Sequence, residues 1–110
     1  MAQTLEKRRY PRAKAPKGLI VAWEAGTRRS VSFIENLALG GLFIRTKQPA
    51  PVASPLGLMV EAPVGDFRAR GIVRRVIPSR GMGIEFVAMS PEDRARLNKL
   101  LAPLLVSSGL

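Results

Sequence analysis

The first chemically suggestive residues lie at positions 7–12, where the sequence KRRYPR carries four positive charges. Arg8 and Arg12 are four positions apart on either side of a Tyr-Pro pair. An arginine guanidinium is a planar fork of donors that fits phosphate oxygens and the edge of guanine, whereas lysine offers a point charge. Pro11 opposes a regular helix, and in an extended segment the two arginines would lie within about 14 Å of each other. The spacing is suited to holding one compact anion from two sides, although a solvated basic tail explains the same residues equally well.

A second candidate stretch lies at residues 35–44, which read ENLALGGLFI. Asn36 suits a turn, while Gly40 and Gly41 permit a positive φ or a close approach of the backbone to a ligand. A glycine-rich turn with exposed backbone N–H groups is also a common way to bind an anion. A plain turn between two strands explains these residues too, so both interpretations stay open.

A second group of arginines lies at positions 68, 70, 74, 75 and 80. Arg68, Arg70 and Arg74 share strand parity, so they are predicted to line one face of a strand. The favoured interpretation is a solvent-facing side that also discourages pairing with other edges. The alternative is a surface that attracts a polyanion.

Composition favours binding over catalysis. Lys and Arg number 18 against 8 Asp and Glu, which gives a net charge of +10 and favours anionic partners without choosing among them. The chain contains neither His nor Cys, so the usual general base and the commonest zinc ligands are missing. We find no carboxylate pair, Walker loop or nucleophile elbow. We therefore expect a protein that is not an enzyme, with no catalytic residues and no metal site.

The elements that must position these residues form one small domain. Residues 1–17 are basic, contain two prolines and show no periodicity, which predicts a flexible arm, and residues 18–110 form the folded part. The chain has no apolar leader and no apolar run near 20 residues, so we expect a cytoplasmic protein with no membrane span.

Six short apolar runs bounded by Gly, Pro or polar residues predict a mainly β fold. A small antiparallel barrel or sandwich fits such closely spaced strands. Within one run, Val31 and Phe33 alternate with Ser30 and Ser32, and Gly65 with a preceding proline predicts a hairpin between the fourth and fifth runs. The predicted strands cover residues 18–23, 28–35, 41–46, 56–62, 66–77 and 81–88.

The last segment changes to helical spacing. Ser90 followed by Pro91 and two acidic residues is a typical helix start. Leucines at 97, 100, 101 and 104 then form one stripe, for which docking on the barrel is favoured over a dimer or partner face. Pro103 is expected to kink or end the helix near residue 102.

Taken together, these residues resemble the PilZ domain, a bacterial receptor module for cyclic di-GMP. That family carries an R-x-x-x-R element in an N-terminal arm, which residues 8–12 match fully. It also carries a [D/N]-x-S-x-x-G element, which residues 36–41 match at Asn36 and Gly41 but not at Ala38, where the family prefers serine. The GMGIEF run before a final helix adds to a resemblance that spans roughly residues 6–104.

The resemblance implies a six-stranded antiparallel barrel whose basic arm folds over cyclic di-GMP, with no other cofactor. Arg8 and Arg12 would contact phosphate and guanine, and Asn36 would bond a guanine edge. Gly41 would leave room for the ligand, and Lys7 would meet a second ligand molecule. The expected binding residues are Lys7, Arg8, Arg9, Arg12, Asn36, Ala38, Gly40 and Gly41.

The same resemblance implies that arm closure signals to a downstream protein, from a monomer or a homodimer. Two other functions are considered. A nucleic-acid-binding barrel is disfavoured because Tyr10 is the one aromatic residue plainly in the polar arm, and single-strand binders stack bases on several aromatics. A ligand-independent adaptor would use the face of Leu97, Leu101 and Leu104.

Overall fold

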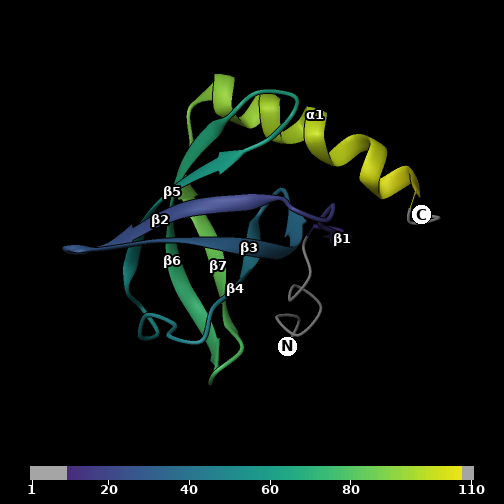
Figure 1. The fold of residues 1–110 in the computed structure, drawn as a ribbon. Helices are drawn as coiled ribbons and strands as arrows, with labels where there is room; N and C mark the ends of the chain where they lie inside the picture. The colour runs from purple at the N-terminus through teal and green to yellow at the C-terminus, as the bar shows by residue number, and fades with distance from the viewer. Residues whose placement is uncertain (1–9, 108–110) are drawn as a thin grey trace, which may run out of the picture.

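The computed structural model describes residues 10–107 and shows an antiparallel β-barrel followed by a helix (Figure 1). Six strands close the barrel, and one short strand precedes them. The predicted six-stranded antiparallel barrel with a C-terminal helix is therefore confirmed. The elements are β1 (Ala13–Lys14), β2 (Ile20–Ala25), β3 (Arg28–Ala38), β4 (Gly41–Arg45), β5 (Pro55–Glu61), β6 (Phe67–Ile77), β7 (Gly81–Ala88) and α1 (Pro91–Ser107).

The barrel closes through β3. The sheet runs in the order β1-β3-β2-β5-β6-β7-β4, and an additional pairing of β3 with β4 joins its ends. β3 has eleven residues, of which 28–33 pair with β2 and 34–38 pair with β4. β5 and β6 form the predicted hairpin, in which Gly65 has a φ of 118° that favours glycine.

The short strand β1 comes from the segment predicted as an arm. Ala13 pairs with Leu37 and Lys14 pairs with Asn36. The Ala13 side chain is buried, and the N–H of Ala15 donates to the carbonyl of Glu35 at 3.0 Å. Residues 13–15 are therefore fixed to β3, close to the second motif.

A β-bulge in β3 sets the direction of the side chains near the hairpin tip. Ile34 pairs with Ile44, but the next pair along β4 is Phe43 with Asn36, so Glu35 is an extra residue. Because side chains alternate along a strand, this insertion reverses the parity of β3 beyond it. Ile34 and Leu37 both face the core, and Asn36 therefore faces outward.

The barrel interior is apolar, with one polar contact at its Trp23 end. Trp23 is buried and donates its indole N–H to the hydroxyl of Ser32 at 3.0 Å. The guanidinium of Arg28 lies 4.9 Å from the centre of the same ring. The serines of the alternating run thus face inward, and its apolar partners Val31 and Phe33 are exposed. A buried indole N–H needs an acceptor, which explains an inward serine.

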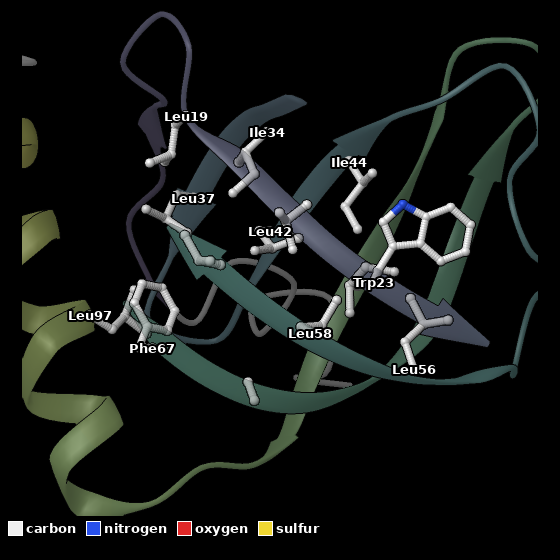
Figure 2. Packing of buried hydrophobic residues seen from close by; sticks show 14 of the residues in the cluster. Leu19, Trp23, Ile34, Leu37, Leu42, Ile44, Leu56, Leu58, Phe67 and Leu97 are labelled. Atoms are coloured by element: carbon white, nitrogen blue, oxygen red, sulfur yellow. The ribbon is translucent and has the colours of Figure 1, made fainter. Parts of the chain in front are cut away.

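Helix α1 docks against the opposite end of the barrel. Figure 2 shows Leu97 beside Phe67 at this end, distant from Trp23. Leu97, Leu100 and Leu101 are buried in the core cluster. Docking of the leucine stripe is therefore confirmed, and the alternative partner face is wrong for Leu97 and Leu101. In the part of the chain that the structure describes, no helix combines the length and apolarity needed to cross a bilayer.

Of the two expected effects of Pro103, a kink or an end of the helix near residue 102, the end is wrong. Helix α1 continues through Pro103 to Ser107. Proline removes one backbone donor and crowds the preceding turn, which usually ends or kinks a helix. Here Leu104 and Leu105 pack partly against the core beyond the proline, and this burial offsets the local cost.

A reciprocal cap starts the helix and ties it to β6. The hydroxyl of Ser90 accepts from the N–H of Asp93 at 3.1 Å and donates to its carboxylate at 2.6 Å. The other carboxylate oxygen accepts from the N–H of Arg68 at 3.0 Å. These bonds lower the pKa of Asp93 below its ordinary value of 3.8, and the bond from Ser90 has the largest effect.

We predict that Ser90→Ala lowers the free energy of unfolding at pH 7 by about 1 kcal/mol, because it removes this cap. In the wild type the Asp93 contribution is complete above pH 3.8 and is lost as the pH falls through the lowered folded-state pKa. Urea denaturation at pH 7 and pH 3 measures both effects. The control is Ser54→Ala, since the Ser54 hydroxyl makes no hydrogen bond within residues 10–107. Equal stability of the Ser90→Ala protein and the wild type at pH 7 would contradict the prediction.

Candidate functional site

Side chains from distant parts of the sequence meet at a cleft of about 680 Å³ on the outer surface of the barrel. We call it the arginine cleft. Its size lies in the range of roughly 300–1,000 Å³ that is typical of small-molecule sites. It is lined by residues 38–41 of the β3–β4 hairpin, residues 83–86 of β7, and Tyr10, Arg12, Arg74, Arg75 and Arg94.

A hydrogen bond joins the two predicted motifs. The Arg12 guanidinium donates to the Asn36 side-chain oxygen at 2.6 Å, although the residues are 24 positions apart. Pairing of β1 with β3 brings Arg12 near the hairpin, and the bulge turns Asn36 outward to meet it. A bond with an ionised donor is stronger than a neutral one, so it orients both side chains.

The hairpin tip is covered by an aromatic ring from the N-terminal segment. A Cβ added to Gly40 would lie 2.6 Å from a ring carbon of Tyr10, so the ring packs directly on this glycine. The Gly40 carbonyl accepts from the N–H of Phe86 at 2.9 Å, which fixes the tip to β7. Tyr10 is 39% exposed, so one side of the ring stays accessible at the cleft.

Gly41 has a structural role that the sequence analysis did not identify. A Cβ at this position would overlap the backbone carbonyl oxygen of Ile84. Gly41 starts β4 and pairs with Glu85, so the overlap would lie between two paired strands. Neither Gly40 nor Gly41 has a positive φ. The expected positive φ is therefore wrong for both glycines, which instead allow close contact with the Tyr10 ring and with the β7 backbone.

Three arginines of the cleft were missing from the predicted site. Arg74 and Arg75 belong to the arginine group on β6, and Arg94 lies in the first turn of α1. The β6–β7 register shifts between Val73 and Arg75, and both arginines are exposed. The β6 group therefore faces solvent as predicted but divides between two regions, because Arg68 and Arg70 lie away from this cleft.

The cleft arginines have partners that orient them. Arg74 forms a salt bridge of 2.5 Å with Glu85, which also lines the cleft. Arg75 lies 5.8 Å from the ring centre of Phe43, a buried residue of β4. A Cβ at Gly81 would lie 2.6 Å from the Phe43 ring, so that glycine makes room for the ring. Such cation–π contacts hold a guanidinium without neutralising it.

The predicted site residues fall into two groups. Arg12, Ala38, Gly40 and Gly41 line the cleft, and Asn36 is bonded to Arg12. Lys7, Arg8 and Arg9 lie outside the described residues. The described cleft holds four arginines and one glutamate, and the chain has no His or Cys. Its side chains are therefore suited to anion binding and stacking.

A family model described as the PilZ domain matches residues 6–102. Among solved structures, the PilZ domain of YcgR from Escherichia coli with c-di-GMP is 17% identical, with 93% of this chain and 94% of that chain covered and a TM-score of 0.73. The Bacillus subtilis inhibitor of motility MotI/DgrA is 20% identical over 91% of this chain and 52% of that one, with a TM-score of 0.76.

The MrkH–c-di-GMP complex of K. pneumonia is 19% identical, covering 94% of this chain and 54% of that one with a TM-score of 0.75. The chain thus spans about half the length of MotI/DgrA and MrkH. A comparison with curated proteins found no match. At these identities the structural likenesses show a shared fold.

We predict that Gly41→Ala lowers the free energy of unfolding by about 1–3 kcal/mol, because overpacking between paired backbones forces the strands apart. The matched control is Gly83→Ala on the neighbouring strand. A Cβ there would meet nothing closer than 3.7 Å, so we expect a change within about 0.5 kcal/mol. Urea denaturation followed by circular dichroism compares the two, and equal stabilities would argue against a structural role for Gly41.

Proposed function

The chain belongs to the PilZ domain family, and we propose that it binds the bacterial second messenger cyclic di-GMP in the arginine cleft. The observation that carries this proposal is the 2.6 Å bond between Arg12 and Asn36. It joins Arg12, which lines the cleft and belongs to one family motif, to Asn36 of the other motif, in a chain without His or Cys. The proposal is thus a ligand-binding role in the cytoplasm, where a second messenger acts.

The chemistry of the ligand fits the chemistry of the cleft. Cyclic di-GMP presents two phosphates and two guanine bases. Arginine binds phosphate oxygens and the O6 and N7 atoms of guanine through the same paired donors. We assign such contacts to Arg8 and Arg12, with Arg9 adding charge, and a guanine contact to Asn36. The exposed side of Tyr10 offers a stacking surface for one base.

Arg74, Arg75 and Arg94 extend this assignment beyond the family motifs. They line the cleft wall, and we propose that they contact the second phosphate of the ligand. Arg74 is already paired with the Glu85 carboxylate at 2.5 Å. A phosphate would replace one anionic partner of Arg74 with another, so binding at this point is an exchange of partners.

The anchored segment limits where closure can occur. Residues 13–15 are held on β3, and Arg12 is bonded to Asn36. These fixed residues therefore take no part in a ligand-driven closure, and we propose that the ligand-bound surface is read by a downstream protein. The related structures differ in output, since MotI is an inhibitor of motility and MrkH a transcription regulatory factor. We therefore expect the process that this protein regulates to depend on the partner that it binds.

A nucleic-acid-binding role receives less support from the aromatic side chains. Single-strand binders stack successive bases on several exposed rings. Within residues 10–107 the large exposed aromatics are Tyr10 and Phe33, and Phe33 does not line the arginine cleft. Trp23, Phe43 and Phe67 are buried. Tyr10 and the half-buried Phe86 are the rings that line the cleft, and two rings suit a single dinucleotide better than a strand.

We predict that calorimetric titration with cyclic di-GMP gives saturable binding that weakens about tenfold or more in Arg8→Ala and in Arg12→Ala. Each substitution removes a hydrogen bond to a charged group, worth about 1.5–3 kcal/mol, and 1.4 kcal/mol is about tenfold in affinity. Arg45→Ala is the control, because Arg45 is exposed on β4 but does not line the cleft.

Two results would contradict the proposed function. One is the absence of heat with the wild type at high micromolar ligand, and the other is unchanged binding in the Arg8→Ala/Arg12→Ala double variant. Titration of a single-stranded oligonucleotide at several salt concentrations tests the alternative, a nucleic-acid-binding role. Steeply salt-dependent binding that cyclic di-GMP does not displace would favour nucleic acid.

We predict that Ala38→Ser tightens cyclic di-GMP binding by up to about tenfold, since it restores a hydroxyl worth roughly 0.5–1.5 kcal/mol per hydrogen bond. Ala38 lies on the cleft wall beyond the bulge, so the hydroxyl would face the ligand. Calorimetry measures the change, and Ala102→Ser on the exposed side of α1 is the control. Equal or weaker binding by Ala38→Ser would show that this hydroxyl has no role in this chain.

A further inference from the structure

A second hollow of about 1,050 Å³ lies on the outside of the barrel, over β2, β3, β5, β6 and the start of α1. It shares no lining residue with the arginine cleft. We call it the outer groove and define it by Ala22, Val31, Gly57, Met59, Arg68 and Arg70. None of these residues has a part in the proposed nucleotide site.

The floor of the outer groove is apolar. Val31 pairs with Ala22 across β3 and β2, and Ala22 pairs with Met59 across β2 and β5, so the three form one outward row. Val31 is 65% exposed, and Phe33, two positions along the same face, is 54% exposed. Contiguous exposed apolar side chains of this kind mark interaction surfaces. In the neighbouring row Gly57 has no side chain of its own, and the side chain of Glu24 lies over it, 3.3 Å from where a Cβ would stand.

One wall of the outer groove is positively charged. Met59 pairs with Arg68 and Gly57 pairs with Arg70, so both arginines project beside the apolar floor. Across the groove, Arg29 is already paired with Glu24 at 3.4 Å. No salt bridge or side-chain hydrogen bond within residues 10–107 involves Arg70, which is exposed. At Arg70, therefore, the β6 wall carries a positive charge that no carboxylate within residues 10–107 neutralises.

We propose that the outer groove binds an acidic amphipathic segment of a partner protein. Apolar side chains of that segment would cover Val31 and Met59, and its carboxylates would pair with Arg68 and Arg70. A second copy of the chain is a poorer occupant, because two chains of net charge +10 would present the same basic wall to each other. An anionic membrane would meet the same arginines, and a vesicle experiment distinguishes it from a partner protein.

The test uses the full chain, labelled with nitrogen-15, and three synthetic helical peptides of equal length. One carries a leucine stripe flanked by glutamate, one carries the same stripe flanked by lysine, and one replaces the leucines with serine and keeps the glutamates. We expect saturable chemical-shift changes centred on Val31, Met59 and Arg70 with the leucine–glutamate peptide alone. Added cyclic di-GMP reports on the other cleft, so failure of either site is seen separately.

Matched variants locate the contact. Val31→Asp and Arg70→Glu should each weaken binding of the leucine–glutamate peptide by roughly fivefold or more, from lost burial and reversed charge. Val52→Asp and Arg45→Glu place the same changes at exposed positions outside the groove and should leave binding unchanged. Dispersed spectra establish that each variant is folded. If Val31→Asp does not fold, Arg70→Glu alone tests whether the groove binds the peptide.

Three outcomes would overturn the proposal. Absence of shifts with all three peptides would show that the groove takes no such segment. Movement of the same resonances on simple dilution of the free protein would identify a second copy as the occupant. Sedimentation with anionic phosphatidylserine vesicles, lost in Val31→Asp and Arg70→Glu but not in their controls, would identify a lipid surface.

Discussion

The direction of the side chains at the β3–β4 hairpin depends on one extra residue in β3. Ser32 and Ile34 face the core, so strict alternation would also turn Asn36 inward, where an unsatisfied amide is costly. The bulge at Glu35 reverses that parity. Phe43, the partner of Asn36, is likewise outside the core cluster, where it is buried with the Arg75 and Arg80 guanidinium groups near its ring. Because of this extra residue, the same two strands form a wall of the cleft on their outer side and part of the apolar interior on their inner side.

Three of the four cleft arginines have a partner that leaves them able to bind anions. Arg12 donates to a neutral amide, Arg75 lies over an aromatic ring, and Arg74 shares a carboxylate. Amide and ring contacts fix a guanidinium while its charge remains, and the carboxylate can be exchanged for a phosphate. Much of the ordering of these side chains is thus complete when the chain folds, which lowers the entropy lost on binding.

Local patterns predicted the fold well, and they predicted part of the site. Turn residues, alternation and the Ser90 start signal identify six strands and a helix. The motif spacing identifies Arg12 and Asn36, which the structure joins. Arg94 carries no local signal, because its place at the cleft arises from helix docking, and Arg75 faces solvent through a register shift. The outward direction of Val31 also follows from tertiary structure, through the need of buried Trp23 for the Ser32 hydroxyl.

The first turn of α1 separates the two hollows of the outer surface. Asp93 lines the outer groove and caps the helix, while the next residue, Arg94, lines the arginine cleft. Successive residues of a helix project about 100° apart, so a small rotation of this turn displaces both walls together. Any two ligands that bias the same rotation are thermodynamically linked, and the linkage is reciprocal. A molecule bound in one hollow would then change the affinity of the other hollow for its own ligand, by the same factor in both directions.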